Sequence, residues 1–420
     1  MAERPQPQPP RPAPEPEPPG VPPTPLPPPG PPPGPEPLPP ITEYDLAIIG
    51  GGLAGAAAAW HAARRGCRVA LLERDSFPRD KVCGEFLSAE AVPVLLAMTP
   101  RLAEAAPRIT RAAFIAPNGR SGEFALPAPA LAVARRDLDA ALWQAAAAAG
   151  CELRARHGVR SCQAHRGGFE LRGETRPSGA AFAVRARAVI VAAGRWWRIA
   201  GLRPAETSRQ RAWLGLKAHL HGDPPAAADG LIEMFYFAGG YCGFAPLGHG
   251  LWNACCLLRG DHARALSASG DFIACLAPLA GSPALERRLR ACRQAAPTVA
   301  TAPVYLRAAP AAAGPVFFAG DAAGFLDPFT GDGMARALLG GALAGESAAE
   351  ALAANEPLEA AARRYAARAA AASRRSFRWA GWLRRLAFAP PWLQTPAARL
   401  LTFAPIAQRA TAATRWRAAQ

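Results

Sequence analysis

A glycine-rich turn between a predicted strand and a predicted helix constrains this chain more than any other feature. Residues 44–49 form a short apolar run typical of a parallel strand that is buried on both faces, and the segment GGGLAG follows at residues 50–55. Residues 53–65 are Ala-rich and helical in pattern, and residues 68–73 form a second apolar run. This order predicts a βαβ unit that begins at Tyr44.

Each glycine of the turn suits a dinucleotide site. Gly50 permits the tight turn, Gly52 lets the backbone approach a pyrophosphate at the helix N-terminus, and Gly55 allows close packing of helix on strand. Glu73 ends the next strand and can accept a hydrogen bond from a ribose hydroxyl. A glycine-rich turn without a ligand is the alternative, but a strand, a helix and an acid in register favour the dinucleotide. The residues expected at this site are Gly50, Gly52, Leu53, Ala54, Gly55, Glu73 and Arg74.

The first forty residues differ in composition from the rest. Residues 1–40 hold 22 of the 46 prolines and almost no aliphatic side chain that could be buried. We expect a disordered, extended polyproline-like arm, with docking of a partner as a candidate role.

The basic charge is concentrated at the other end of the chain. The net charge is +16, yet residues 363–420 alone carry twelve arginines and no Asp or Glu, so nucleic-acid binding is not predicted. Residues 373–389 are expected to form a helix with Trp379, Trp382, Leu383 and Leu386 on one face and arginines on another. Such a helix either lies on an anionic bilayer or packs on the protein.

Cysteine spacing and hydropathy bound the compartment and the metal chemistry. The nine cysteines include no C-x-x-C pair and no Cys/His spacing that suits zinc, so we expect reduced thiols and no metal site. The N-terminus has no apolar signal region, and no run of about 18 apolar residues occurs. A cytoplasmic protein is predicted, with contact at the inner membrane face as an alternative.

Two further segments carry a family resemblance. GDAAGFLDPFTGDGM at residues 320–334 follows a predicted buried strand and opens a predicted helix, and FPRDKVCGEFLS occupies residues 77–88. Together they resemble the geranylgeranyl reductase-like branch of FAD-dependent oxidoreductases, which are relatives of the hydroxybenzoate hydroxylase-type flavoproteins. The resemblance covers about residues 44–350.

That resemblance implies FAD as the cofactor. Asp321 would bind the ribityl chain, although an ordinary helix-capping role is the alternative, and the helix that follows it would aim a partial positive charge at the flavin. Arg135 would approach the cofactor phosphates, with Arg136 as its competitor. Cys83 would sit beside the flavin, or else be a buried structural thiol. The FAD-facing residues implied here are Cys83, Gly84, Arg135, Val159, Gly194, Asp321, Gly331, Gly333 and Met334.

The segment GGYCGFAP at residues 239–246 lies where isoprenoid reductases of this branch carry a substrate motif. Tyr241 and Pro246 match that motif, whereas Gly243 and Ala245 replace larger aromatic residues of the family. We therefore expect Tyr241, Phe244 and Pro246 to contact substrate in a widened pocket. A plain sheet turn is the alternative.

The predicted fold class is α/β, with a doubly wound FAD-binding domain of the ββα type, an antiparallel-sheet substrate domain and a helical C-terminal tail. The expected boundaries are residues 1–40 for the arm, 41–202 and 311–352 for the FAD-binding domain, 203–310 for the substrate domain and 353–420 for the basic tail. Residues near 106–133 are expected to reach toward the substrate domain.

The expected function is reduction of an apolar unsaturated, isoprenoid- or polyketide-like substrate by hydride transfer from flavin. NAD(P)H is the expected reductant, and it would visit the flavin transiently, because no second G-x-G-x-x-G motif indicates a separate nicotinamide domain. A quinol or a protein reductant is the alternative. The alternatives are a monooxygenase of the same fold and a non-catalytic flavin-binding interaction protein. No His, Asp or Glu stands out in the sequence as a catalytic acid, so the catalytic residues are left unassigned.

Overall fold

The strand predicted after the proline-rich segment lies at the centre of a parallel sheet. The computed structural model describes residues 41–195, 197–202, 213–222, 229–237, 239–259, 270–305, 307–325, 330–387 and 403–416. The predicted arm, residues 1–40, lies outside the described residues.

The first sheet has eight strands and carries the expected glycine turn. Its parallel core runs in the order β18-β9-β1-β2-β6, with β17 antiparallel at one edge and a β7–β8 hairpin continuing from β9. The strands are β1 (Thr42–Ile49), β2 (Val69–Leu72), β6 (Glu152–Arg154), β7 (His157–His165), β8 (Gly168–Thr175), β9 (Ala181–Val191), β17 (Ala312–Ala313) and β18 (Val316–Phe318).

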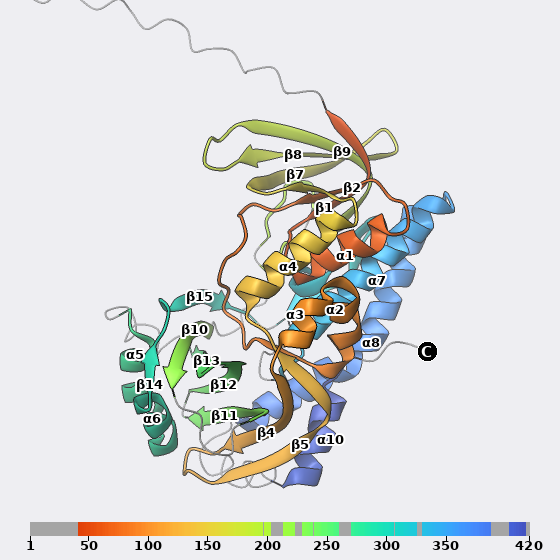
Figure 1. Cartoon of the computed structure of the whole chain (residues 1–420). Coiled ribbons are helices and arrows are strands. Elements are labelled where there is room, and N and C mark those ends of the chain that lie inside the picture. The colour runs from red at the N-terminus through yellow and green to blue at the C-terminus, as the bar shows by residue number, and fades with distance from the viewer. Residues whose placement is uncertain are drawn as a thin grey trace, which may run out of the picture. The chain divides into compact units, whose positions relative to one another are not determined.

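Helices cover one face of this sheet, and the β7–β8 hairpin packs against the other (Figure 1). On the helical face, Leu46, Ile48 and Phe317 are fully buried beneath alanines of the helices. On the hairpin side, Val189 and Leu171 are also fully buried. The helices of this part are α1 (Leu53–Ala63), α2 (Val92–Met98), α3 (Pro100–Ala105), α4 (Arg135–Ala148), α7 (Gly333–Ala353) and α8 (Leu358–Ala387), with the short 3₁₀ turns η1 (Ala89–Ala91) and η3 (Gly320–Ala323).

The second sheet has nine strands in the order β14-β10-β13-β12-β11-β4-β5-β3, with β15 also paired to β10. All its pairs are antiparallel except β11 with β4, so the residues near 106–133 join this sheet through β4 and β5. Its strands are β3 (Phe86–Leu87), β4 (Arg108–Ile115), β5 (Ser121–Ala132), β10 (Trp213–Gly222), β11 (Leu231–Phe237), β12 (Gly240–Gly248), β13 (Leu251–Arg259), β14 (Cys292–Gln294) and β15 (Val299–Val304).

Three smaller features complete the fold. Helices α5 (Phe272–Ala280) and α6 (Pro283–Arg290) cover the outer face of the second sheet, and α10 (Ala404–Ala413) lies beside β5 (Figure 1). Strands β16 (Arg307–Ala308) and β19 (Gly324–Phe325) form a separate two-stranded ribbon.

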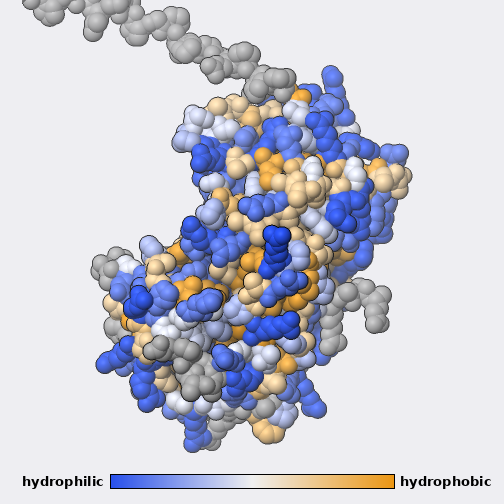
Figure 2. All heavy atoms as spheres, in the orientation of Figure 1, coloured by the Kyte–Doolittle hydropathy of each residue, from blue (hydrophilic) through white to orange (hydrophobic). Residues whose placement is uncertain are grey.

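Figure 2 shows a largely hydrophilic face that is hollowed between the β7–β9 part and the β10–β15 part. The expected α/β fold with a second, mostly antiparallel sheet and C-terminal helices is confirmed.

The predicted tail helix is the C-terminal half of α8. Ser376 is fully buried there, and Arg336 of α7 lies 4.3 Å from the ring centroid of Phe377, so this part packs on the protein. The side chains of α8 from residue 380 to its end, including Trp382, Leu383 and Leu386, lie outside the described residues. Among the described helices, none is long and apolar enough to cross a membrane.

Helices α1 and α7 approach each other through glycines of α7. A Cβ added at Gly341 would overlap the carbonyl oxygen of Ala54, and one added at Gly345 would overlap that of Ala58. These are backbone atoms, so a side chain can be accommodated only by moving the helices apart.

The neighbouring glycines Gly340 and Gly341 therefore offer a matched test of this packing. A Cβ at Gly340 would make an ordinary contact, 3.8 Å from the Trp416 ring. We predict that Gly341→Ala lowers the free energy of unfolding by about 1–3 kcal/mol, because it overpacks the helix interface. Gly340→Ala should be neutral or stabilise by about 0.5–1 kcal/mol, because alanine favours a helix over glycine. Urea unfolding followed by circular dichroism measures both, and equal stability of the two variants would contradict the close approach.

Candidate active site

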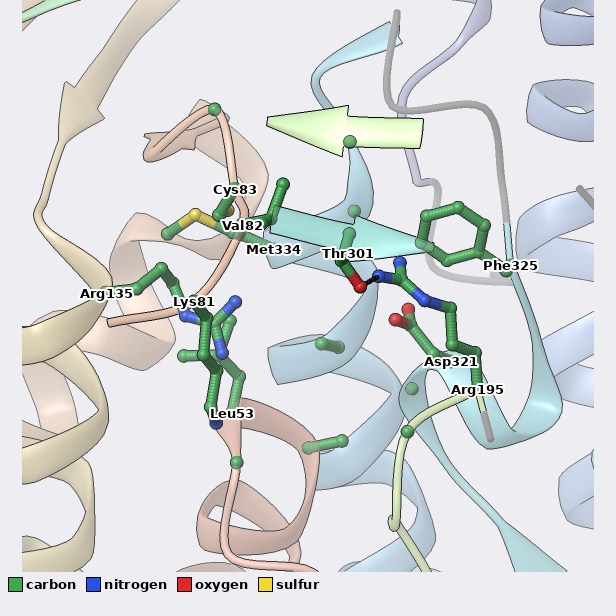
Figure 3. A pocket seen from close by; sticks show the side chains of 18 of the residues that line it. Leu53, Lys81, Val82, Cys83, Arg135, Arg195, Thr301, Asp321, Phe325 and Met334 are labelled. Carbon is green, nitrogen blue, oxygen red and sulfur yellow. Dashed lines mark hydrogen bonds between the residues drawn. The ribbon is translucent and has the colours of Figure 1, made fainter. Parts of the chain in front are cut away.

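A cavity of about 960 Å³ runs from the glycine turn of the first sheet to the inner side of the second sheet. One end is lined by the turn, by residues after β2 and by the β7–β8 hairpin. The other end is lined by apolar side chains of β4, β5, β11 and β12. Because residues of both sheets line one continuous space, a long cofactor and an apolar substrate can occupy it together. Figure 3 shows part of this cavity, with Cys83 and Met334 on one side and Arg195 and Asp321 on the other.

The glycine turn is held against the end of β9. Gly50 has a φ of +105°, and a Cβ there would lie 2.5 Å from the carbonyl oxygen of Ala192. A Cβ at Gly55 would overlap the carbonyl oxygen of Gly50. Both positions therefore require glycine, and α1 begins directly after the turn at Leu53.

Glu73 is buried at the turn, with 5% of its surface exposed. One carboxylate oxygen accepts a hydrogen bond from the Gly51 backbone N–H at 2.8 Å, and the other accepts from the Asp75 N–H at 3.1 Å. Arg79 forms an ion pair with the same carboxylate at 3.2 Å. The side chain expected to reach a ribose thus also braces the turn, while Arg74 lines the cavity next to it.

Several glycines of the cavity wall face open space, so no side chain covers their backbone. A Cβ at Gly52 would meet only the Lys81 Nζ, at 3.5 Å, and Cβ atoms at Gly84, Gly194 and Gly333 would meet nothing within 4 Å. All four glycines line the cavity. Backbone N–H groups at the start of α1 and α7 are therefore accessible to a flat or phosphorylated ligand, and the residues present fit FAD.

Lys81 is a cavity residue that the sequence reading missed. Its ammonium lies 2.6 Å from Oδ2 of Asp139, and Oδ1 of the same carboxylate accepts two hydrogen bonds from Arg135. Burial opposes ionisation of Asp139, but the charges of Arg135 and Lys81 outweigh it and lower the pKa of this carboxyl. Asp139 thereby orients both cations beside the turn. The available signal was that Lys81 is one of only two lysines in an arginine-rich chain.

Asp321 lies across the cavity from this cation pair. Burial raises the pKa of its carboxyl, and the nearby charge of Arg195 opposes that shift. Arg195 donates to the Thr301 hydroxyl at 2.9 Å and lies 4.8 Å from the ring centroid of Phe325 (Figure 3). Arg195 was not predicted either, although it directly follows Ala193-Gly194 at the end of β9.

The second predicted FAD motif forms the start of α7. Gly331 has a φ of +65°, and a Cβ there would lie 2.9 Å from the Phe86 ring. Thr330, Gly331, Gly333 and Met334 all line the cavity. Residues 326–329 of this motif lie outside the described residues.

Asp332 precedes α7 and is completely buried behind this segment. Burial raises the pKa of its carboxyl to about 7, against the opposing charges of Arg415 and Arg336. The Ser88 hydroxyl donates to it at 3.4 Å. A carboxyl that changes charge near neutral pH thus lies next to the segment expected to face the flavin.

Cys83 lines the cavity where the loop after β2 crosses to the second sheet. Its sulfur accepts from the Glu85 N–H at 3.4 Å, and its carbonyl accepts from the Asn253 amide at 3.0 Å. The thiol is therefore held at a set position in the cavity wall, near Met334 in Figure 3.

A buried ionic cluster supports this loop from behind. The Glu85 carboxylate accepts from Lys217 Nζ at 2.6 Å and lies 2.7 Å from His219 Nε2, and Lys217 also donates to Asp80 at 3.1 Å. Asp80, Glu85 and His219 each offer one atom that could bind a metal ion, and these atoms lie within 4.8 Å of one another. The Lys217 ammonium bonds to both carboxylates of this group, so a lysine already supplies the cation.

The predicted substrate residues separate into two groups. Tyr241 and Phe244 line the cavity, whereas Pro246, on the same strand, is not among the lining residues. Of the remaining predicted FAD contacts, Leu53, Ala54 and Val159 line the cavity. The apolar end of the cavity is formed by Phe114, Phe124, Leu126, Ile232, Met234 and Tyr241.

Comparison with known proteins identifies the relatives of this chain. The family model of FAD dependent oxidoreductases matches residues 45–83. Digeranylgeranylglycerophospholipid reductase 2 of Methanopyrus kandleri is 32% identical over 329 residues, which is 74% of this chain and 78% of that protein. A geranylgeranyl bacteriochlorophyll reductase-like protein from Thermoplasma acidophilum has a TM-score of 0.73 at 19% identity, over 89% of this chain and 96% of that one. A flavin-dependent brominase has a TM-score of 0.71 at 18% identity, over 90% and 95% of the two chains. At these identities, both structures share the fold alone with this chain.

Gly52→Ala tests the cofactor cradle without disturbing the fold. The added methyl group fits the protein, with Lys81 Nζ at 3.5 Å as its nearest neighbour, but it occupies the place where a pyrophosphate would approach the backbone. We expect the affinity for FAD to fall at least about tenfold, equivalent to 1.4 kcal/mol. The melting temperature without FAD should stay unchanged. FAD fluorescence titration measures the first and thermal unfolding the second. Unaltered FAD affinity would remove Gly52 from the site.

Asp332→Asn tests the buried carboxyl through the pH dependence of stability. The pKa of Asp332 is raised from 3.8 to about 7 on folding, so the folded state holds a proton that the unfolded state releases. This contribution to stability is complete below about pH 4 and is lost as the pH rises through 7, amounting to at most about 4 kcal/mol. We predict a shallower decline for Asp332→Asn than for the wild type between pH 4 and 7, in urea unfolding of FAD-free protein. Parallel curves for the two proteins would show that Asp332 does not titrate in this range.

Proposed function

The chain belongs to the geranylgeranyl reductase-like family of FAD-dependent oxidoreductases, and we propose that it reduces a carbon–carbon double bond of an apolar, isoprenoid-like lipid. The observation that carries this proposal is the continuity of the cavity from the dinucleotide turn to an apolar chamber. We call this chamber the substrate chamber and define it by Phe114, Phe124, Leu126, Ile232, Met234 and Tyr241.

The chain's residues would share the binding of FAD along the cavity. The N–H groups at the start of α1 suit the pyrophosphate, with the Lys81 and Arg135 cations beside it. Glu73 would receive the adenosine ribose, and Asp321 the ribityl hydroxyls. Gly333 and Met334 at the start of α7 would face the ring system, where the helix dipole favours the negative charge of the reduced form.

The substrate chamber would exclude water and orient the lipid. Its walls are aromatic and aliphatic, so an isoprenoid chain gains free energy by leaving water for this surface. When bound, FAD supplies the hydride for one carbon of the double bond, and a proton completes the other. NAD(P)H is the proposed donor that restores the reduced cofactor by visiting the cavity transiently.

We assign residues 41–202 and 311–352 to FAD binding and residues 203–310 to substrate binding, with β4 and β5 as an outlying part of the substrate side. This division is supported by the pairing of β4 with β11 and by the return of β18 to the first sheet. A substrate of this kind resides in membranes, so we also propose peripheral contact with an anionic lipid surface. The exposed Trp379, Phe403 and Ile406, which are 36%, 59% and 38% exposed, support that contact.

The proposed reductase activity can be tested on FAD-loaded protein under anaerobic conditions. We expect NADPH to bleach the flavin absorbance and a digeranylgeranyl glycerophospholipid in detergent micelles to restore it, with loss of double bonds detected by mass spectrometry. Matched phospholipid with saturated chains is the control and should leave the flavin reduced. In a parallel assay to which air is admitted, oxygen uptake that is stoichiometric with a hydroxylated product would instead indicate a monooxygenase. Bound flavin that no donor reduces would overturn the enzymatic proposal.

A further inference from the structure

The C-terminal segment folds back onto the second sheet and reaches the cavity. Helix α10 lies along β5 (Figure 1), where Ala407 is fully buried against Ala112 and Phe124. The Gln408 amide donates to the carbonyl of Ala125 in β5 at 3.2 Å. Segment 403–416 is therefore packed on the same two strands that form one side of the substrate chamber.

The side of this segment that faces the cavity carries small residues. Ala407, Thr411 and Thr414 line the cavity together with Arg415. The Thr414 hydroxyl donates to the Thr411 carbonyl at 2.8 Å, which turns it back toward its own backbone. A larger side chain at any of these positions would reduce the volume of the substrate chamber. The six residues that define the chamber are already large, so they leave little room to compensate.

Arg415 anchors this segment to the part of the chain that precedes α7. Its guanidinium donates to the Thr330 carbonyl at 3.3 Å and lies 5.5 Å from the ring centroid of Phe86. The Arg415 carbonyl accepts from the Ser376 hydroxyl of α8 at 3.2 Å. Arg415 is 8% exposed, and the charges of Asp332 and Glu90 act against the cost of burying it. The wall residues and the flavin-facing segment are thus joined by one buried cation.

We propose that the C-terminal segment forms the specificity wall of the substrate chamber: the small side chains of Ala407, Thr411 and Thr414 set the size of the lipid that the chamber admits. Arg415 is the positioning residue that holds this wall in place. This inference rests on the proposed function for its substrate class. It does not depend on catalysis for its geometry, because the segment lines the cavity whichever ligand enters.

Thr411→Leu and Thr411→Trp test the wall by filling the chamber in two steps. Arg409→Leu and Arg409→Trp are matched controls, since Arg409 lies on the exposed side of the same helix. The probes are Nile red, which reports an apolar chamber by fluorescence without any reaction, and the isoprenoid alcohols geraniol and geranylgeraniol. We expect Thr411→Trp to weaken the binding of Nile red and geranylgeraniol at least about tenfold. The shorter geraniol should lose less affinity for this variant. Thr411→Leu should weaken the binding of each probe less than Thr411→Trp does. The Thr411 variants should bind FAD with the affinity of the wild type. The Arg409 variants should bind FAD and all three probes as the wild type does.

The results separate failure of the wall from failure of the proposed function. If Thr411→Trp binds Nile red and geranylgeraniol like the wild type while folded, the wall is rejected. If the wild type binds Nile red but neither alcohol, and Thr411→Trp still loses Nile red, the wall stands and the isoprenoid substrate class fails.

Arg415→Met and Arg415→Lys provide an independent test, because a tryptophan at position 411 could detach α10 instead of filling the chamber. We expect Arg415→Met to speed trypsin cleavage at Arg409 at least about fivefold and to weaken Nile red binding, because the anchor to Thr330 is lost. Arg415→Lys, which keeps the charge, should show a smaller change in both. Cleavage and binding equal to the wild type in Arg415→Met would overturn the anchoring role.

Discussion

The arrangement of the cavity depends on the contacts of one buried carboxylate, that of Glu85. It holds Lys217 and His219 of β10 and also accepts from the Arg135 N–H at the start of α4. A fully buried carboxylate is several kcal/mol less stable if it loses its partners, so these contacts strongly favour one placement of the loop between β2 and α2. Glu85 even adopts a left-handed conformation, with a φ of +55°, which a non-glycine residue tolerates only when its surroundings compensate. Glu85 thereby joins the start of α4 to β10 of the second sheet, at the edge of the cavity.

Charge is distributed unevenly around this junction. Near the glycine turn, Asp139 is kept ionised by Lys81 and Arg135, and it orients two cations toward the place expected for phosphates. Near α7, burial raises the pKa of Asp332 toward neutrality, although two arginines lie close by. The first arrangement suits a bound anion, because two cations share one carboxylate and a net positive charge remains. In the second arrangement, the carboxyl of Asp332 can gain or lose a proton near neutral pH. It lies next to the segment that would face the flavin, whose own charge would change on reduction.

The local parts of the fold were predictable because each depends on neighbours in sequence. The strand at Tyr44–Ile49, the turn, α1 and β2 follow one another within thirty residues, and their apolar periodicity is characteristic. The second motif was recognisable because it combines a buried strand, η3 and the start of α7 in order. The helix predicted to open from residues 320–334 begins at Gly333. The tail helix predicted from Ser373 is one with α8, which begins at Leu358, because alanine-rich sequence continues a helix without marking its ends.

By itself, the sequence determined that this chain contains a glycine-rich turn between a buried strand and a helix, and which family it resembles, because glycine spacing and strand–helix order are local properties. Only the tertiary structure decided which other residues reach the cavity. Lys81 lies within the segment at residues 77–88 and Arg195 directly follows Ala193-Gly194, but neither was assigned a role from the sequence. Their roles arise from Asp139 and Thr301, which are distant in sequence. The wall formed by α10 is the extreme case, since residues 404–415 meet β4 and β5 almost three hundred positions earlier in the chain. Such contacts depend on how complementary surfaces pack, and the pattern of one segment does not reveal the surface that it will meet.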